Sequence, residues 1–302
     1  MKSPASLVIV SLGLALAAHA QTTKPEILAR MDQTKAAYED IALKIWGYAE
    51  LGYQETKSSA LLQEHFRSQG FTLQTGLVGE PTSFIASYGS GHPILAIIGE
   101  FDALPELAQE AWEPTRKPIP NQKAGHGCGH NLFGAGSAAA AVAVKDWMKA
   151  TGQKGTLRYY GCPAEEGGSG KVYMVRDGLF ADVDAVLHWH ASDRNSANPS
   201  SNLANKSAKF RFHGSVVGEQ ASQPRNAIKG LEAMDLMVAL MRDQMPPDSV
   251  VQYAVLHAGQ APNVPTMFAE NFYYIRNHSR LLAEEGFRNV VHAAEGAALG
   301  TG

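Results

Sequence analysis

Cysteine is scarce in this sequence, with two residues among 302, and no block of lysine or arginine occurs. Cys128 and Cys162 could pair in an oxidising compartment, but a chain of this size does not need one disulfide to hold its fold. The formal net charge is −3. We therefore expect neither nucleic acid nor an anionic membrane surface as a partner.

Long apolar runs are also missing, except near the N-terminus. Lys2 precedes an apolar run from Leu7 to Ala18, and Ala18-His19-Ala20 ends it. This is the layout of a secretory signal peptide, and the run is too short to span a bilayer as a helix. We predict that residues 1–20 are a signal peptide and that the mature protein is periplasmic or secreted, with no membrane span.

Apolar strand patterns alternate with helical patterns in the first two thirds of the chain. Strands are predicted at 84–88, 94–98, 156–162 and 185–190, and helices at 25–46, 58–69, 132–150 and 171–176. Such alternation is typical of an α/β domain with a mostly parallel sheet and helices on both faces. We assign residues 21–205 to this domain, and its last residues, 192–205, to a polar linker.

The pattern changes after the linker. A strand is predicted at 208–213, a helix at 227–242, two strands at 250–256 and 267–276, and a helix at 284–294. This order indicates a two-layer α+β domain over residues 206–302, and such a unit ordinarily has one more strand. We therefore expect the second domain to be incomplete at the C-terminus.

Potential metal ligands follow several of the predicted strands. The glycine-rich loop Gly125-His126-Gly127-Cys128-Gly129-His130-Asn131 carries a thiol and an imidazole two residues apart, and both bind metals well. Glu165-Glu166 follows one strand, and His188-Trp189-His190 ends another. Because the carboxyl ends of parallel strands form the ligand-binding edge of an open sheet, these groups can converge there.

Simpler interpretations exist for each of these residues. Cys128 and His130 could be a buried thiol and a structural histidine, and Glu165-Glu166 a solvated turn. His188 and His190 would share one face of a strand, so alternation does not choose between them. His126 is expected outside the ligand set. The remaining acid, Asp102, could orient a ligand histidine or cap a turn.

The motifs together resemble one known family. They are Gly99-Glu100-Phe101-Asp102-Ala103-Leu104-Pro105, the loop 125–131, Tyr160-Gly161-Cys162-Pro163-Ala164-Glu165-Glu166-Gly167-Gly168 and Trp189-His190. In these motifs the chain is similar to the aminoacylase and amidohydrolase branch of the zinc-dependent exopeptidases. The resemblance implies a metallopeptidase-type hydrolase that cleaves the amide of N-acyl or N-aroyl amino acids. It also implies a lid domain inserted in the catalytic domain. This lid would mediate pairing, either into a homodimer or with another subunit.

The resemblance also implies roles for single residues. Cys128, His130, Glu166 and His190 would bind two divalent ions, Mn²⁺ or Zn²⁺, and Glu165 would be the general base. Two ions about 3.5–4 Å apart can activate a water and polarise the scissile carbonyl, while a carboxylate moves the proton. For the substrate, Asn263 matches a substrate-facing asparagine of the family, and Arg276 could grip a carboxylate bidentately.

The sequence departs from the family pattern at two places. Gly218 stands where the family has a histidine that helps to hold substrate, and the loss of such a donor commonly costs about 10²- to 10³-fold in rate. The chain also ends at Gly302, before the family's last lid strand and last histidine ligand. We therefore expect a C-terminally truncated member. The alternatives are a relic that binds metal without turnover, and a thiol hydrolase with Cys128 as nucleophile, which leaves Glu165-Glu166 without a role.

Overall fold

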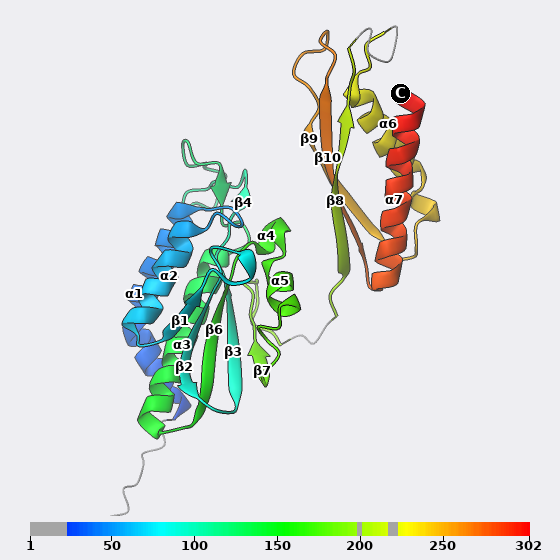
Figure 1. Ribbon diagram of the computed structural model, residues 1–302. Coiled ribbons are helices and arrows are strands. Elements are labelled where there is room, and N and C mark those ends of the chain that lie inside the picture. The colour runs from blue at the N-terminus through cyan, green and yellow to red at the C-terminus, as the bar shows by residue number, and fades with distance from the viewer. Residues whose placement is uncertain (1–22, 198–200, 217–222) are drawn as a thin grey trace, which may run out of the picture. The chain divides into compact units, whose positions relative to one another are not determined.

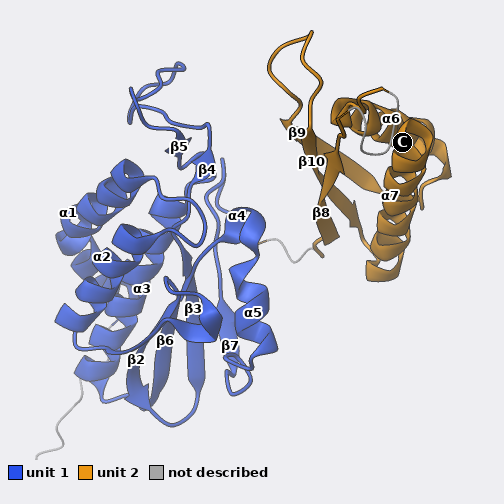
Figure 2. Ribbon diagram, turned by 45° about the horizontal axis from the view of Figure 1, so that its top comes forward, with its two compact units in different colours: residues 1–195 blue, residues 196–302 orange. Residues whose placement is uncertain are grey.

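The computed structural model describes residues 23–197, 201–216 and 223–302. The chain divides into two compact units, residues 1–195 and 196–302 (Figure 2). The division falls inside the segment that we predicted as a linker. Among the helices that the structure describes, none is long and apolar enough to cross a membrane. The predicted signal peptide and Gly218 lie outside the described residues.

A five-stranded sheet forms the centre of the first unit, in the order β1-β2-β6-β3-β7. Its strands are β1 (Thr72–Thr75), β2 (Phe84–Ser90), β3 (Ile94–Glu100), β6 (Gly155–Cys162) and β7 (Ala185–Leu187). β2 is antiparallel to both neighbours, whereas β3 is parallel to β6 and β7. All strands except β2 therefore run in one direction, which confirms the predicted, mostly parallel sheet.

Helices cover both faces of this sheet, as predicted (Figure 1). On one face lie α1 (Lys24–Tyr48), α2 (Thr56–Ser68) and α3 (His130–Thr151), around a core that includes Phe66, Phe84 and Tyr159. On the other face, Met174 of α5 (Gly170–Arg176) packs with Ile98 and Tyr160. The short elements are η1 (Leu77–Gly79), α4 (Glu165–Gly168), and the paired β4 (Leu104–Pro105) and β5 (Ala124–Gly125), which close the base of a proline-rich loop.

The position of α3 follows from its small residues. Ala135, Ala138 and Ala141 are buried against the sheet, and a Cβ on Gly134 would lie 2.7 Å from the carbonyl oxygen of Glu100. Glycine at 134 therefore lets the helix approach the end of β3 closely. This contact places the first residue of the helix, His130, beside the carboxyl end of β3.

The second unit is a two-layer α+β structure, also as predicted. β8 (Ala204–His213), β10 (Phe268–Asn277) and β9 (Val250–His257) form an antiparallel sheet in that order. α6 (Ala227–Leu240) and α7 (Arg280–Thr301) pack on it, and η2 (Arg242–Gln244) follows α6. The core joins residues of both layers: Phe212, Leu231, Met234, Tyr273, Ile275 and Val290.

The aromatic core of the first unit gives a test of this fold. Phe66 is fully buried and contacts the rings of Phe71, Phe84 and Tyr159. Phe66→Ala should therefore lower the free energy of unfolding of this unit by about 3–5 kcal/mol, measured by urea denaturation. Leu28→Ala, at a half-exposed position of α1, is the control and should change it by no more than about 0.5 kcal/mol. Equal effects of the two substitutions would contradict the packing.

Candidate metal site

The predicted site residues of the first unit gather at the carboxyl ends of three neighbouring strands. Asp102 follows β3, Glu165 and Glu166 follow β6, and His190 follows β7. Cys128 and His130 reach the same edge from the loop before α3. Ligand atoms of Cys128, His130 and His190 all lie within 4.8 Å of one another. The same limit holds for a second group, His130 with Glu100 and Glu165.

His130 is the buried centre of this cluster. Its Nδ1 lies 2.9 Å from Asp102 Oδ1, and its Nε2 lies 3.0 Å from Glu100 Oε2 without hydrogen-bond geometry. Burial by itself lowers the pKa of His130, but Asp102 and Glu100 outweigh it and raise the pKa to about 10. A carboxylate on Nδ1 fixes the ring and directs Nε2 toward a metal, the arrangement expected of Asp102.

Glu166 contacts Asp102 through its backbone, and Cys128 contacts His190. The backbone N–H of Glu166 donates to Asp102 Oδ2 at 2.8 Å, and its buried Oε1 has no hydrogen-bond partner. Cys128 Sγ lies 3.2 Å from His190 Nε2. Burial, and then the Glu166 carboxylate, raise the pKa of the Cys128 thiol to about 12. The thiol alone is therefore a poor nucleophile at neutral pH, which disfavours the thiol-hydrolase alternative.

The two histidines after β7 differ in their contacts. The strand predicted to reach His190 ends at Leu187, so the strand alternation that we assumed for His188 and His190 is wrong there. His190 belongs to the group with Cys128, and its ring centre is 5.8 Å from that of His130. His188 packs edge-on against Phe133, with Nε2 3.9 Å from Glu100 Oε1.

Sequence reasoning gave no role to two charged residues of the site. Glu100 is buried and contacts both His130 and Lys171 Nζ. Burial opposes ionisation of Glu100, but these two partners outweigh it and lower its pKa to about 2. The position of Glu100 at the end of a predicted strand could have indicated a role in the site. No sequence pattern indicated a role for Lys171. His126, expected outside the ligand set, lies with Nε2 3.0 Å from the Ile45 carbonyl.

The donor set fits a divalent metal ion. Nε2 of His130 and Oε1 of Glu166 are buried polar atoms that lack a hydrogen-bond partner, which is costly unless another group binds them. A thiol, imidazoles and carboxylates together suit a zinc-like ion, and carboxylates and imidazoles also suit manganese. Both cysteines are free thiols, so Cys128 is available as a ligand.

The predicted substrate residues belong to the second unit. Asn263 lies in the β9–β10 loop, and Arg276 is on β10. The guanidinium of Arg276 lies 5.2 Å from the ring centre of Tyr274, and its buried Nε has no hydrogen-bond partner. Arg276, Phe272 and Tyr253 help to line a cavity of about 340 Å³. The roles of Asn263 and Arg276 in substrate binding stay predictions.

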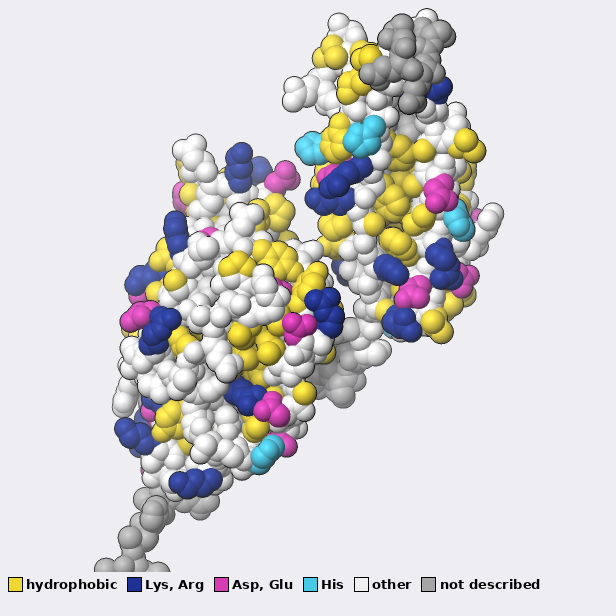
Figure 3. Space-filling model, in the orientation of Figure 1, with side chains coloured by type: hydrophobic (Ala, Val, Ile, Leu, Met, Phe, Trp, Pro, Cys, Tyr) yellow, Lys and Arg dark blue, Asp and Glu magenta, His cyan; other side chains and the backbone are white. Residues whose placement is uncertain are grey.

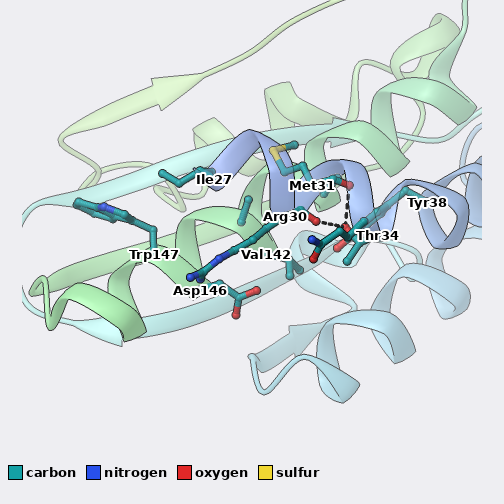
Figure 4. Close-up of a pocket in the computed structure, with 11 residues that line it drawn as sticks. Ile27, Arg30, Met31, Thr34, Tyr38, Val142, Asp146 and Trp147 are labelled. Atoms are coloured by element: carbon teal, nitrogen blue, oxygen red, sulfur yellow. Dashed lines mark hydrogen bonds between the residues drawn. The ribbon is translucent and has the colours of Figure 1, made fainter. Parts of the chain in front are cut away.

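A separate cavity of about 240 Å³ lies between α1 and α3 (Figure 4). Arg30, Tyr38, Asp146 and Trp147 are among the residues around it. No predicted metal ligand lines this cavity, so we assign it no part in the chemistry of the cluster.

Comparisons with known proteins identify related sequences and folds. Residues 96–276 match Peptidase family M20/M25/M40. The chain is 39% identical over 275 residues to a p-aminobenzoyl-glutamate hydrolase component of Escherichia coli, covering 90% of this chain and 57% of that protein. It thus spans less than two thirds of the length of that relative.

Solved structures show the same fold at lower identity. An aminobenzoyl-glutamate utilization protein from Klebsiella pneumoniae superposes with a TM-score of 0.67 at 18% identity, over 91% of this chain and 75% of that one. A dinuclear metal binding peptidase of Bacillus subtilis gives 0.59 at 19% identity, over 93% and 72%. The residues matched by the family model include the whole predicted metal cluster, and the chain belongs to Peptidase family M20/M25/M40.

Proposed function

We propose that this chain is a metal-dependent amidohydrolase that cleaves the amide of N-aroyl or N-acyl amino acids. The observation that carries the proposal is the convergence of Cys128, His130, His190 and the Glu165-Glu166 pair at one edge of the sheet. The Escherichia coli relative is by its name part of a p-aminobenzoyl-glutamate hydrolase, which supports an aroyl-glutamate as the substrate class.

Each residue of the cluster has a distinct task in this proposal. Two divalent ions, Zn²⁺ or Mn²⁺, would supply Lewis-acid activation of a water and of the scissile carbonyl. Cys128, His130, Glu166 and His190 would hold the ions, and the Asp102 carboxylate accepts the Nδ1–H of His130 so that Nε2 faces the cluster.

Glu165 moves the proton. Its Oε2 lies 4.0 Å from His130 Nε2, and its side chain is 43% exposed, so it borders the cluster and remains open to a substrate. It accepts the proton of the attacking water and passes it to the leaving amine. Carboxylate binding by Arg276 and Asn263, both in the second unit, remains a prediction from the sequence.

The two cysteines provide a matched test of metal binding. Cys128→Ala should weaken Zn²⁺ binding by more than about tenfold, because the loss of a group that merely orients a ligand already costs about 10- to 100-fold. Cys162→Ala removes a buried thiol from β6 and should leave the affinity near that of the unaltered chain. Competition with a chromophoric chelator measures both. Unchanged affinity in Cys128→Ala would remove Cys128 from the ligand set.

The role of Glu165 is tested by Glu165→Gln, which keeps the size of the side chain and removes the base. Release of p-aminobenzoate from p-aminobenzoyl-glutamate should fall by about 10²- to 10⁴-fold, while the bound metal per chain stays the same. Glu64→Gln, on the exposed face of α2, is the control. Equal hydrolysis by the unaltered chain and Glu165→Gln would sink the catalytic proposal. Inhibition by a thiol alkylator but not by a chelator would favour the thiol nucleophile.

We also propose that the second unit mediates pairing, in a homodimer or with a different chain. In β9, Tyr253 lies opposite Tyr273 of β10, and Val255 lies opposite Asn271. Paired side chains share one face of a sheet, so Tyr253 and Val255 point to the face on which Tyr273 and Asn271 are buried. Tyr253 and Val255 are nevertheless 53% and 47% exposed. Residues 250–257 contain no Lys, Arg, Asp or Glu that would protect this edge strand from pairing. Hydrophobic side chains are visible on this unit in Figure 3.

Charged substitutions on β9 test the pairing. Light scattering after gel filtration should give the mass of a dimer for the unaltered chain. Tyr253→Lys with Val255→Lys should give the mass of a monomer, because the burial of two lysines at the edge is costly. Leu28→Lys, at a half-exposed position of the first unit, should stay dimeric. A monomeric unaltered chain would contradict the homodimer, and a dimer that persists with both lysines would contradict pairing through this edge.

Finally, we propose that the protein is exported to the periplasm or secreted. The layout of residues 1–20 supports this proposal.

A further inference from the structure

The turn that carries Glu165 and Glu166 has an unfavourable backbone. Ala164, Gly167 and Ser169 all have positive φ angles, of 53°, 94° and 56°. Alanine and serine adopt this region reluctantly because their Cβ atoms crowd the backbone. Such a conformation persists only when its surroundings hold it.

The surroundings include a segment between α1 and α2 that lies far away in the sequence. Glu55 Oε1 accepts the N–H of Ala164 at 2.8 Å, and Tyr53 Oη donates to the carbonyl of Gly168 at 2.8 Å. A Cβ on Gly52 would lie 2.9 Å from Ala164, so this segment sits directly against the start of the turn.

Both carboxylate oxygens of Glu55 accept a hydrogen bond. Its side chain is fully buried, and its second oxygen accepts the Thr82 hydroxyl at 2.9 Å. Both of these neighbours donate hydrogen bonds, which suits a carboxylate, since its two oxygens only accept. A second buried acid, Glu80, lies at the other end of the turn, with its Oε1 3.1 Å from where a Cβ of Gly170 would be.

We propose that Glu55 is a positioning residue for the Glu165-Glu166 pair. Its carboxylate anchors Ala164, directly before the pair, while Asp102 anchors the N–H of Glu166. With both points fixed, Glu166 faces Cys128 and Glu165 borders His130. This inference rests on the proposed function, in which both acids act at the metal cluster.

Glu50 offers a matched control, because it is a carboxylate of the same segment. It accepts the N–H groups of Lys57 and Ser58 at the start of α2, and no described contact joins its side chain to the turn. We would compare Glu55→Ala, Glu55→Gln and Glu50→Ala in the full chain. The measurements are backbone hydrogen exchange of residues 163–170 by mass spectrometry and Zn²⁺ affinity by chelator competition.

Glu55→Ala should speed exchange in the turn by at least about tenfold and weaken Zn²⁺ binding by about 10- to 100-fold. Glu55→Gln should restore both to within about threefold, because its amide oxygen can still accept from Ala164 while its NH₂ donates to Thr82. Glu50→Ala should speed exchange at residues 57–58 and leave the turn and Zn²⁺ affinity unchanged.

The proposal is overturned if Glu55→Ala leaves exchange of the turn at the rate of the unaltered chain, or if Glu50→Ala speeds it equally. Hydrolysis of p-aminobenzoyl-glutamate by the unaltered chain is measured in parallel. Its absence would contradict the proposed function, whereas the exchange rates still decide whether Glu55 anchors the turn.

Discussion

The contacts of one carboxylate, Asp102, hold the cluster together. One oxygen of Asp102 lies against Nδ1 of His130, and the other accepts the backbone N–H of Glu166. A residue at the end of β3 thereby fixes groups from α3 and from the turn after β6. Because Asp102 is 1% exposed, water competes little for these bonds, and electrostatic interactions are stronger than at the surface.

The charges around Asp102 have a consequence for what the site attracts. Glu100, Asp102, Glu165 and Glu166 surround the single ring of His130, and Lys171 reaches Glu100 from α5. Buried charges are retained only when partners compensate them. The excess of acidic groups around His130 therefore favours a bound cation, which Nε2 of His130 and the unpartnered Oε1 of Glu166 are placed to meet.

Much of the fold and of the candidate site could be predicted from the sequence because it depends on local patterns. Buried strands such as β3 are continuous apolar runs, and the glycine-rich loop, the acid pair and the histidines are short motifs next to strands. What the sequence hid depends on distant contacts. β1 is a short, mostly exposed edge strand of mainly polar residues, and β7 pairs with only three residues of β3. The partners of Glu100 and Glu55 lie far away in the chain, so no spacing could indicate them.

The close approach of α3 to the end of β3 divides the candidate metal site into two mechanically different parts. With Gly134 against the carbonyl of Glu100, helix and strand cannot shift independently, so His130, Asp102 and Glu100 form one rigid body. Glu166 is tied to this body through the bond of its N–H to Asp102 Oδ2, whereas His190 reaches the cluster from irregular chain after β7. In the proposed site, ions of different radius would thus be accommodated by displacement of His190, while the geometry around His130 stays the same.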